Sequence, residues 1–172
     1  MRGARRRPRQ ARLGRRLMRL GTLRAMAMLT AMLLLLAPVV AAGSAFICTP
    51  TRVWDGDGPL WCAEGPRIRL AGIAAREIDG SCKDGHPCPA ESGPAARDAL
   101  VALVGRPVGR SREGHILVRG KPLRCVSEGS GKGERTAAWC WTGDGVQINC
   151  AMVSGGHALR WAIYDRGRKL CR

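Results

Sequence analysis

The sequence predicts a mainly β domain with a few α-helices (α+β), crosslinked by disulfide bonds. Short segments that suit β-strands recur between turns that contain Gly, Pro and Asp, as expected of a small β domain. One segment, 93–104, carries an apolar stripe at helical spacing and is bounded by Pro94 near its start and Gly105 after its end. Eight cysteines all follow residue 47, and an even number in a small domain is typical of a disulfide framework.

The expected elements are short and follow one another closely. Strands are expected at 46–54, 60–63 and 67–73, as one or two hairpins within 107–125, and at 135–141. Helices are expected at 93–104, at 150–154 after an N-cap at Asn149, and around Trp161 and Tyr164. Loops are expected over 74–91 and, as a flexible segment, over 128–134. About five short strands, with a helix inserted before the later ones, indicate a five-stranded, partly open barrel of the OB type with two to three helices.

The N-terminal 45 residues have the three-part composition of a secretory signal peptide. Ten arginines and no acidic residue precede residue 25, an uncharged and mainly apolar run spans 25–42, and small residues continue to Ala45. We therefore expect cleavage after Ala42 or Ala45, a periplasmic or secreted protein, and a mature domain over 46–172. The alternative is a membrane anchor at 25–42, since 18 apolar residues can span a bilayer. Pro38 and the small residues that follow it favour cleavage.

The formal net charge of +16 comes mostly from this N-terminal segment. The whole chain has 29 basic and 13 acidic residues, but from residue 25 onward 19 basic residues face all 13 acidic ones, a formal charge of +6. A moderately basic domain is compatible with a phosphate-bearing partner and does not require one. The length supports one domain after removal of an export segment, which we expect to be a monomer.

The segment from Arg67 to Glu77, RIRLAGIAARE, is central to the expected domain. Ile68 and Leu70 alternate with arginines, so Arg69 is expected on the strand face opposite the apolar one. Glu77 follows in the loop after this strand. A carboxylate close to a strand that displays a guanidinium suits an anionic substrate and its attack by water.

Several separated segments together resemble the staphylococcal-nuclease-like (thermonuclease) family. They are Gly56-Asp57-Gly58, RIRLAGI at 67–73 with a Glu four residues later, a helix, an Arg at the start of a later strand, and an Asn-initiated helix that ends in Gly. The resemblance covers roughly 47–162. It implies an OB-fold nuclease that hydrolyses phosphodiesters in DNA and RNA with calcium.

The resemblance implies a catalytic role for Arg69, Glu77 and Arg135, and a calcium-binding role for Asp57. Two planar guanidinium groups can bind the oxygens on which charge develops during phosphoryl transfer. Glu77 can deprotonate or orient the attacking water. A hard cation held by carboxylates would neutralise part of the diester charge.

The chain departs from the family pattern at several of these positions. Ala74 replaces the second metal-binding Asp, Gly58 replaces a Thr, and Arg76 replaces a Pro. The Tyr-Gly pair before the second arginine is Gly133-Glu134. Losing one of two carboxylates weakens a calcium site, since affinity follows the charge of the ligands. We therefore expect weakened or altered calcium dependence, with Arg76 as a candidate substrate-binding residue that supplies positive charge in place of the metal.

The cysteines are expected to form disulfides rather than a metal site. Cys82, His86 and Cys88 provide only three potential ligands, at a spacing of no common zinc finger, so no zinc is expected. The expected pairs are Cys48–Cys62, Cys82–Cys88, Cys125–Cys140 and Cys150–Cys171. Because aromatic residues make up only 4% of the chain, these crosslinks would supplement a modest core, in which Trp139, Trp141 and Trp161 are expected to lie.

The sequence thus favours an exported, nuclease-like phosphodiesterase that acts on DNA or RNA. The first alternative is a non-catalytic OB-type module that binds nucleic acid or another polyanion through the retained arginines. The second is a disulfide-stabilised envelope protein whose fold serves protein contacts only.

Overall fold

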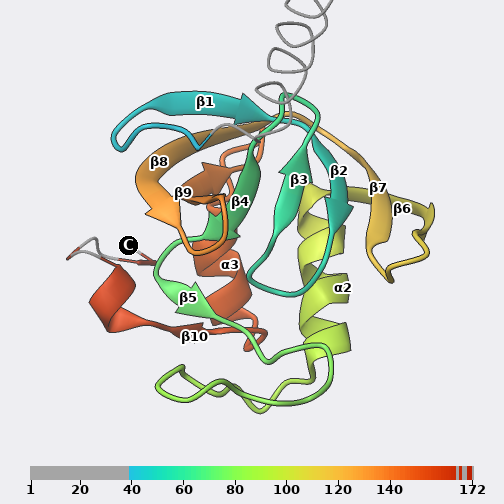
Figure 1. Ribbon diagram of the computed structural model, residues 1–172, viewed down its shortest axis with the longest axis vertical. Coiled ribbons are helices and arrows are strands. Elements are labelled where there is room, and N and C mark those ends of the chain that lie inside the picture. The colour runs from blue at the N-terminus through green and yellow to red at the C-terminus, as the bar shows by residue number, and fades with distance from the viewer. Residues whose placement is uncertain (1–38, 166, 168–169, 172) are drawn as a thin grey trace, which may run out of the picture. The chain divides into compact units, whose positions relative to one another are not determined.

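The computed structural model describes residues 39–165, 167 and 170–171 of the chain (Figure 1). Most of the expected signal peptide at 1–45, and nearly all of the alternative anchor at 25–42, lie outside these residues. In the part that the structure describes, no helix combines the length and the apolar character that a membrane span requires. The described residues belong to one compact unit, 37–172.

The described residues form mainly β structure with two α-helices and one short 3₁₀ helix. The strands are β1 (Ala45–Cys48), β2 (Pro50–Val53), β3 (Leu60–Cys62), β4 (Arg67–Leu70), β5 (Ile73–Ala74), β6 (Gly105–Arg110), β7 (Ile116–Gly120), β8 (Leu123–Gly131), β9 (Arg135–Trp141) and β10 (Leu159–Arg160). The helices are α2 (Gly93–Val104), α3 (Ile148–Ser154) and the 3₁₀ helix η1 (Ala162–Tyr164).

Eight strands form one curled sheet in the order β1-β8-β9-β4-β3-β2-β7-β6 (Figure 1). Neighbouring strands within this sheet are antiparallel, except for β4 and β9, which run parallel. The short strands β5 and β10 form a separate antiparallel pair. The predicted α+β class is confirmed, and the sheet contains more strands than the five expected.

The expected first strand, 46–54, is divided into β1 and β2 at Thr49. The Thr49 N–H donates to the Glu64 carboxylate at 2.8 Å instead of continuing a strand ladder. On either side of this residue the strands have different partners, because β1 pairs with β8 while β2 pairs with β3 and β7. One chain segment therefore contributes to two distant parts of the sheet.

The prediction of a flexible loop at 128–134 is wrong, because most of this segment is strand. β8 continues to Gly131 and pairs with β9 up to the start of that strand, so the turn is reduced to 132–134. Gly129 has a positive φ of 94° at an irregularity in the register, a conformation that glycine adopts without steric cost. The Gly-rich composition reflects a bulged, twisted hairpin rather than a flexible loop.

The segment 107–125 holds one hairpin and one crossover. β6 pairs with β7, whereas β8 leaves this hairpin to pair with β1 and β9. β6 is the last strand of the sheet, and its residues are exposed except for the half-buried Gly105. Pro107 and two arginines lie on this edge strand.

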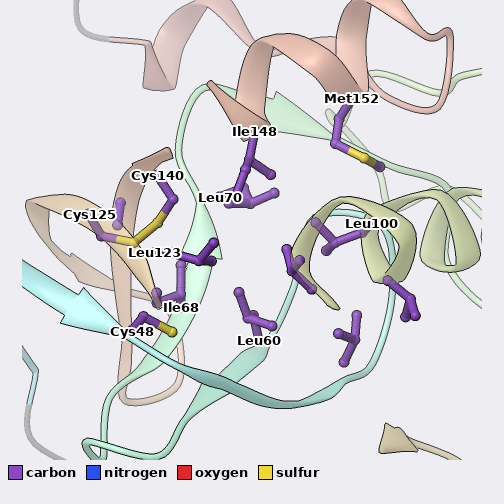
Figure 2. Close-up of a cluster of buried hydrophobic side chains, with 14 of the residues drawn as sticks. Cys48, Leu60, Ile68, Leu70, Leu100, Leu123, Cys125, Cys140, Ile148 and Met152 are labelled. Atoms are coloured by element: carbon purple, nitrogen blue, oxygen red, sulfur yellow. A yellow bond between two sulfur atoms is a disulfide. The ribbon is translucent and has the colours of Figure 1, made fainter. Parts of the chain in front are cut away.

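The core lies between the curled sheet and the two α-helices (Figure 2). It includes Leu60, Ile68, Leu70, Leu100, Leu123, Ile148 and Met152, each fully shielded from solvent or nearly so. Ser92 caps α2 by accepting from the Ala95 N–H, and the helix ends at Gly105 as predicted. Trp139 is also buried, while Trp141 and Trp161 are only partly covered.

The prediction that Asn149 caps the second helix is wrong. The N-cap of α3 is Gln147, and Asn149 lies inside the first turn with its side chain fully buried. Its amide group donates to the Ala71 and Ala138 carbonyls at 2.9 and 3.1 Å and accepts from the Cys140 N–H at 3.1 Å. This residue therefore satisfies buried backbone groups of the segment after β4 and of β9, and joins both to α3.

All four predicted disulfides are present: Cys48–Cys62, Cys82–Cys88, Cys125–Cys140 and Cys150–Cys171. They join β1 to β3, close the loop before α2, cross-link β8 and β9, and tie the C-terminal segment to α3. Four disulfides in so small a domain indicate an oxidising, extracellular type of environment.

Replacing Asn149 by Ala should lower the free energy of unfolding by at least about 2 kcal/mol, because the buried Ala71 carbonyl and Cys140 N–H lose their partner. The Ala138 carbonyl keeps the Ala71 N–H as a donor at 2.9 Å. Urea unfolding followed by tryptophan fluorescence measures the change. The matched control is Gln147→Ala, since the Gln147 side chain makes no capping bond. An equally small loss in both variants would contradict this role of Asn149.

Candidate active site

A pocket of about 680 Å³ opens beside β4, the β8–β9 hairpin and the C-terminal segment. Five basic residues are among those that line it: Arg67, Arg69, Lys83, Lys132 and Arg135. Of the described residues lining the pocket, Glu128 is the one acidic residue, and its carboxylate accepts from the Trp139 indole at 2.9 Å. A concave surface with this excess of positive charge favours an anionic ligand.

Arg69 and Arg135 reach this pocket because β4 and β9 are parallel neighbours. Arg69 is in register with Ala137, and side chains at paired positions share one face of a sheet. Arg135 lies two residues before Ala137, so the period of two in a strand brings it to the same face. Both arginines line the pocket, and the expected alternation of β4 is confirmed, with Ile68 and Leu70 fully buried.

The Arg69 guanidinium is held by the Asp57 carboxylate in a two-pronged ion pair. Nη1 and Nη2 of Arg69 donate to Oδ1 and Oδ2 of Asp57 at 3.0 and 2.9 Å. The side chains are only 18% and 8% exposed. The Asp57 carbonyl also accepts from the Leu70 N–H at 2.8 Å, and Oδ2 accepts from the Ala75 N–H at 3.2 Å. The turn and β4 are thus joined by both backbone and side chain.

Asp55 and Asp57 form a buried acidic pair beneath the arginine. Asp55 accepts from the Asp57 N–H at 3.2 Å, and both residues are 6% exposed. Burial, reinforced by the nearby charges of Asp57 and Glu77, raises the pKa of Asp55 to about 8. Burial also raises the pKa of Asp57, while the Arg69 guanidinium acts against that rise. The pKa of Asp55 therefore lies well above that of an ordinary carboxyl group.

Glu77 lies next to the pocket without lining it. Its carboxylate forms an ion pair with the Lys83 ammonium, Oε1 to Nζ 2.5 Å, and its side chain is 24% exposed. Gly93, at the start of α2, packs so closely on the Glu77 carbonyl that a Cβ there would collide with it. The helix start therefore fixes the backbone of Glu77 beside the pocket wall that carries Lys83.

Arg135 is half-buried at the start of β9. Its Nε donates to the Lys132 carbonyl at 2.5 Å, which orients the side chain across the hairpin turn. Burial lowers the pKa of Arg135, and the neighbouring positive charge of Arg69 lowers it further. The two guanidinium groups come from separate strands and line the same pocket.

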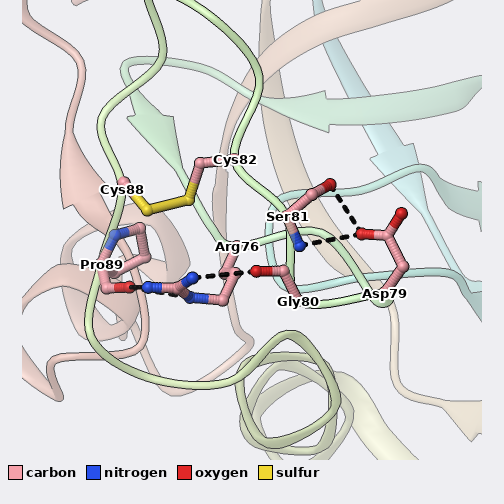
Figure 3. The surroundings of a disulfide bond; sticks show 7 residues. All are labelled: Arg76, Asp79, Gly80, Ser81, Cys82, Cys88 and Pro89. Carbon is pink, nitrogen blue, oxygen red and sulfur yellow. Dashed lines mark hydrogen bonds between the residues drawn. A yellow bond between two sulfur atoms is a disulfide. The ribbon is translucent and has the colours of Figure 1, made fainter.

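Arg76 has structural partners rather than a place in the pocket (Figure 3). Its guanidinium donates to the Pro89 carbonyl from Nε and Nη2 at 3.1 and 2.8 Å, and to the Gly80 carbonyl from Nη1 at 2.9 Å. These bonds join the two ends of the disulfide-closed loop. Arg76 is therefore not among the residues that line the pocket, whose cationic lining consists of lysines and other arginines.

The residues at the expected metal position do not fit a calcium ion. Both Asp57 carboxylate oxygens accept from Arg69. Ala74, which occupies the second ligand position, has no donor atom, is fully buried and pairs with Leu159 in the short β5–β10 ladder. Among the described residues, no group of three or more acidic, His or Cys side chains is arranged to hold a metal. The Arg69 guanidinium balances the Asp57 charge that a cation would otherwise balance.

Sequence reasoning missed three aromatic rings and two lysines of the pocket. The tilted His86 ring and the edge-on Tyr164 ring both contact Trp161, with centroids 4.1 and 4.4 Å from that of Trp161. The Arg69 guanidinium lies 5.5 Å from the Trp161 centroid. Trp161 was expected in the core, but it lines the pocket. The sequence offered one indication of the two lysines, their closeness to predicted site residues. Lys83 follows Glu77 by six residues, and Lys132 precedes Arg135 by three.

Comparisons with protein-family models, with curated proteins and with solved structures found no match. The function is therefore argued from the geometry of the pocket.

Replacing Arg69 by Met should lower the free energy of unfolding by about 3–5 kcal/mol, because the buried Asp57 charge loses its partner. Arg67→Met is the matched control on the same strand. Arg67 pairs with Glu134, whose side chain is 56% exposed, so its loss should cost about 1 kcal/mol or less. Chemical denaturation at pH 7 measures both, and equal losses would show that the Asp57–Arg69 pair does not stabilise the fold.

Proposed function

We propose that this chain is an exported, nuclease-like phosphodiesterase that hydrolyses DNA or RNA without the two-carboxylate calcium site of the family it resembles. The observation that carries this proposal is the arrangement of Arg69 and Arg135, which come from parallel strands to line one pocket with Glu77 beside it. The four disulfides support export.

We also propose that the core of the sheet is an OB-type barrel. β1 and β2 are separated by Thr49 alone, and they lie at the two ends of the strand run β1-β8-β9-β4-β3-β2. If both are counted as one bent strand, five strands close on themselves, with β7 and β6 added at the side of β2. This arrangement supports the proposed resemblance, since an OB barrel is a five-stranded, partly open Greek-key barrel.

The pocket's side chains would divide the chemistry between them. Arg69 and Arg135 bind the nonbridging oxygens and stabilise the charge that develops there. Asp57 holds Arg69 in position through one proton of each terminal nitrogen, which leaves further N–H donors of the guanidinium for a phosphate. Glu77 acts as the general base for the attacking water. The raised pKa of Asp55 favours its uncharged form, which limits the repulsion that an approaching phosphate experiences.

A non-catalytic polyanion-binding module is the second candidate function. The observation that favours it is the Lys83–Glu77 ion pair, because a carboxylate held by an ammonium group is a poorer base. Both candidates use the same basic pocket, and they differ in whether bound nucleic acid is cut.

Degradation of a single-stranded oligonucleotide and of plasmid DNA should separate the two candidates. The wild-type chain is expected to cut, and Glu77→Gln and Arg135→Ala should each reduce the rate by about 10²-fold or more. Glu113→Gln is the control, because Glu113 is an exposed acid outside the pocket. Binding of the oligonucleotide without any cutting would favour the non-catalytic module.

Chelation of divalent ions should leave the cutting rate unchanged, because the Asp57 carboxylate is already neutralised by Arg69. Parallel assays with excess calcium and with excess chelator measure this, and calcium should not raise the melting temperature, since a ligand that binds the native state would do so. Complete loss of cutting in chelator would overturn the metal-independent form of the proposal.

A further inference from the structure

The loop between β5 and α2 forms one wall of the pocket, and its conformation is fixed by several interactions (Figure 3). The Cys82–Cys88 disulfide closes its centre, and Arg76 joins its ends through the Gly80 and Pro89 carbonyls. Ser81 donates to the Asp79 carboxylate from its N–H and its hydroxyl at 2.9 and 2.6 Å. The backbone of Lys83, the residue after Cys82, is therefore held in a defined position.

Two residues of this loop, Lys83 and His86, line the pocket. His86 packs on Trp161, and burial together with the positive charges of Arg69 and Lys83 lowers the pKa of its imidazole. His86 therefore supplies a ring and little charge at neutral pH. Lys83 is the cation of this wall, whereas the other four cations of the pocket belong to β4 and to the β8–β9 hairpin.

The Lys83 ammonium is well suited to exchange partners. Its Nζ lies 2.5 Å from Glu77 Oε1, but the lysine side chain is 62% exposed. An ion pair in this setting is weak, because water screens it and a flexible side chain must be ordered to form it. Lysine has three ammonium donors on a four-carbon stem, so Nζ can turn toward an anion in the pocket that Lys83 already lines.

We propose that Lys83 is a phosphate-binding residue of this pocket and that it holds the Glu77 carboxylate until phosphate arrives. The phosphate and Glu77 compete for one ammonium group, so binding of the substrate releases the carboxylate beside it. Glu77 is thereby kept paired in the free protein and becomes available as a base only when a phosphodiester occupies the pocket. This inference rests on the proposed function, of which it specifies the positioning of the base.

Binding of a single-stranded phosphorothioate oligonucleotide, which resists hydrolysis, tests the first part. Measured over a range of salt concentrations, Lys83→Ala should reduce the slope of log affinity against log salt by about 0.7, the value for one lost phosphate contact on a single strand. Lys83→Arg should retain the wild-type slope. Lys121→Ala is the matched control, since Lys121 lies in the turn between β7 and β8 and outside the pocket lining. A Lys83→Ala slope equal to that of Lys121→Ala would overturn the proposal.

A double-mutant cycle tests the competition with Glu77. Glu77→Gln should raise oligonucleotide affinity when Lys83 is present, because the ammonium no longer has a competing partner. The gain should be lost in the Lys83→Ala background, whereas an equal gain in both backgrounds would overturn the proposal. Thermal unfolding should be similar in all these variants, because Lys83 is exposed.

These experiments distinguish a failure of the proposed phosphodiesterase function from a failure of the proposed role of Lys83. Binding with the expected Lys83 dependence but without hydrolysis of an ordinary oligonucleotide would remove the proposed enzymatic function and keep Lys83 as a phosphate ligand. Hydrolysis without Lys83 dependence would do the reverse. Absence of salt-dependent binding by the wild-type chain would remove both.

Discussion

The buried ion pair between Asp57 and Arg69 connects the two segments on which the site depends. Asp57 comes from the turn between β2 and β3, and Arg69 from β4, which is the strand that runs parallel to β9. Both side chains are largely removed from water. Loss of either partner would therefore leave the other as an uncompensated buried charge, which strongly destabilises the fold. The pair sets the position of one pocket arginine and, through the parallel register, its relation to Arg135. It also neutralises the charge at the position where the family resemblance implies a cation.

Local sequence signals predicted much of the fold, because they depend on few residues. The period-two pattern of β4, Pro94 in the first turn of α2 and the glycine that ends this helix required only near neighbours in the chain. The four expected cysteine pairs are all present. Asn149 was recognised as a special residue but was assigned the wrong role, since its partners at Ala71 and Ala138 are distant in the sequence.

The parts of the site that were missed depend on contacts between distant segments. No pattern within 128–134 shows that these residues pair with β9, and composition alone suggested a loop. Trp161 is a large aromatic residue of the kind usually found in a core, yet it lines the pocket, because it directly follows β10, which pairs with β5. Arg76 was considered for its charge next to Glu77, but its orientation is set by carbonyls at Gly80 and Pro89. The sequence thus indicated residue types, and the fold decided which of them meet.

Strand β6 ends the sheet on one side, and on its outer side none of the described residues forms a neighbouring strand. Such an edge can recruit a strand from another molecule, which leads to aggregation. Pro107 removes one N–H donor from this edge, and Arg106 and Arg110 place like charges where two copies would approach. The irregular register between Pro107 and Gly109 further disturbs a straight pairing surface. The same basic character that suits the pocket to anions thus also protects this border of the sheet against self-association.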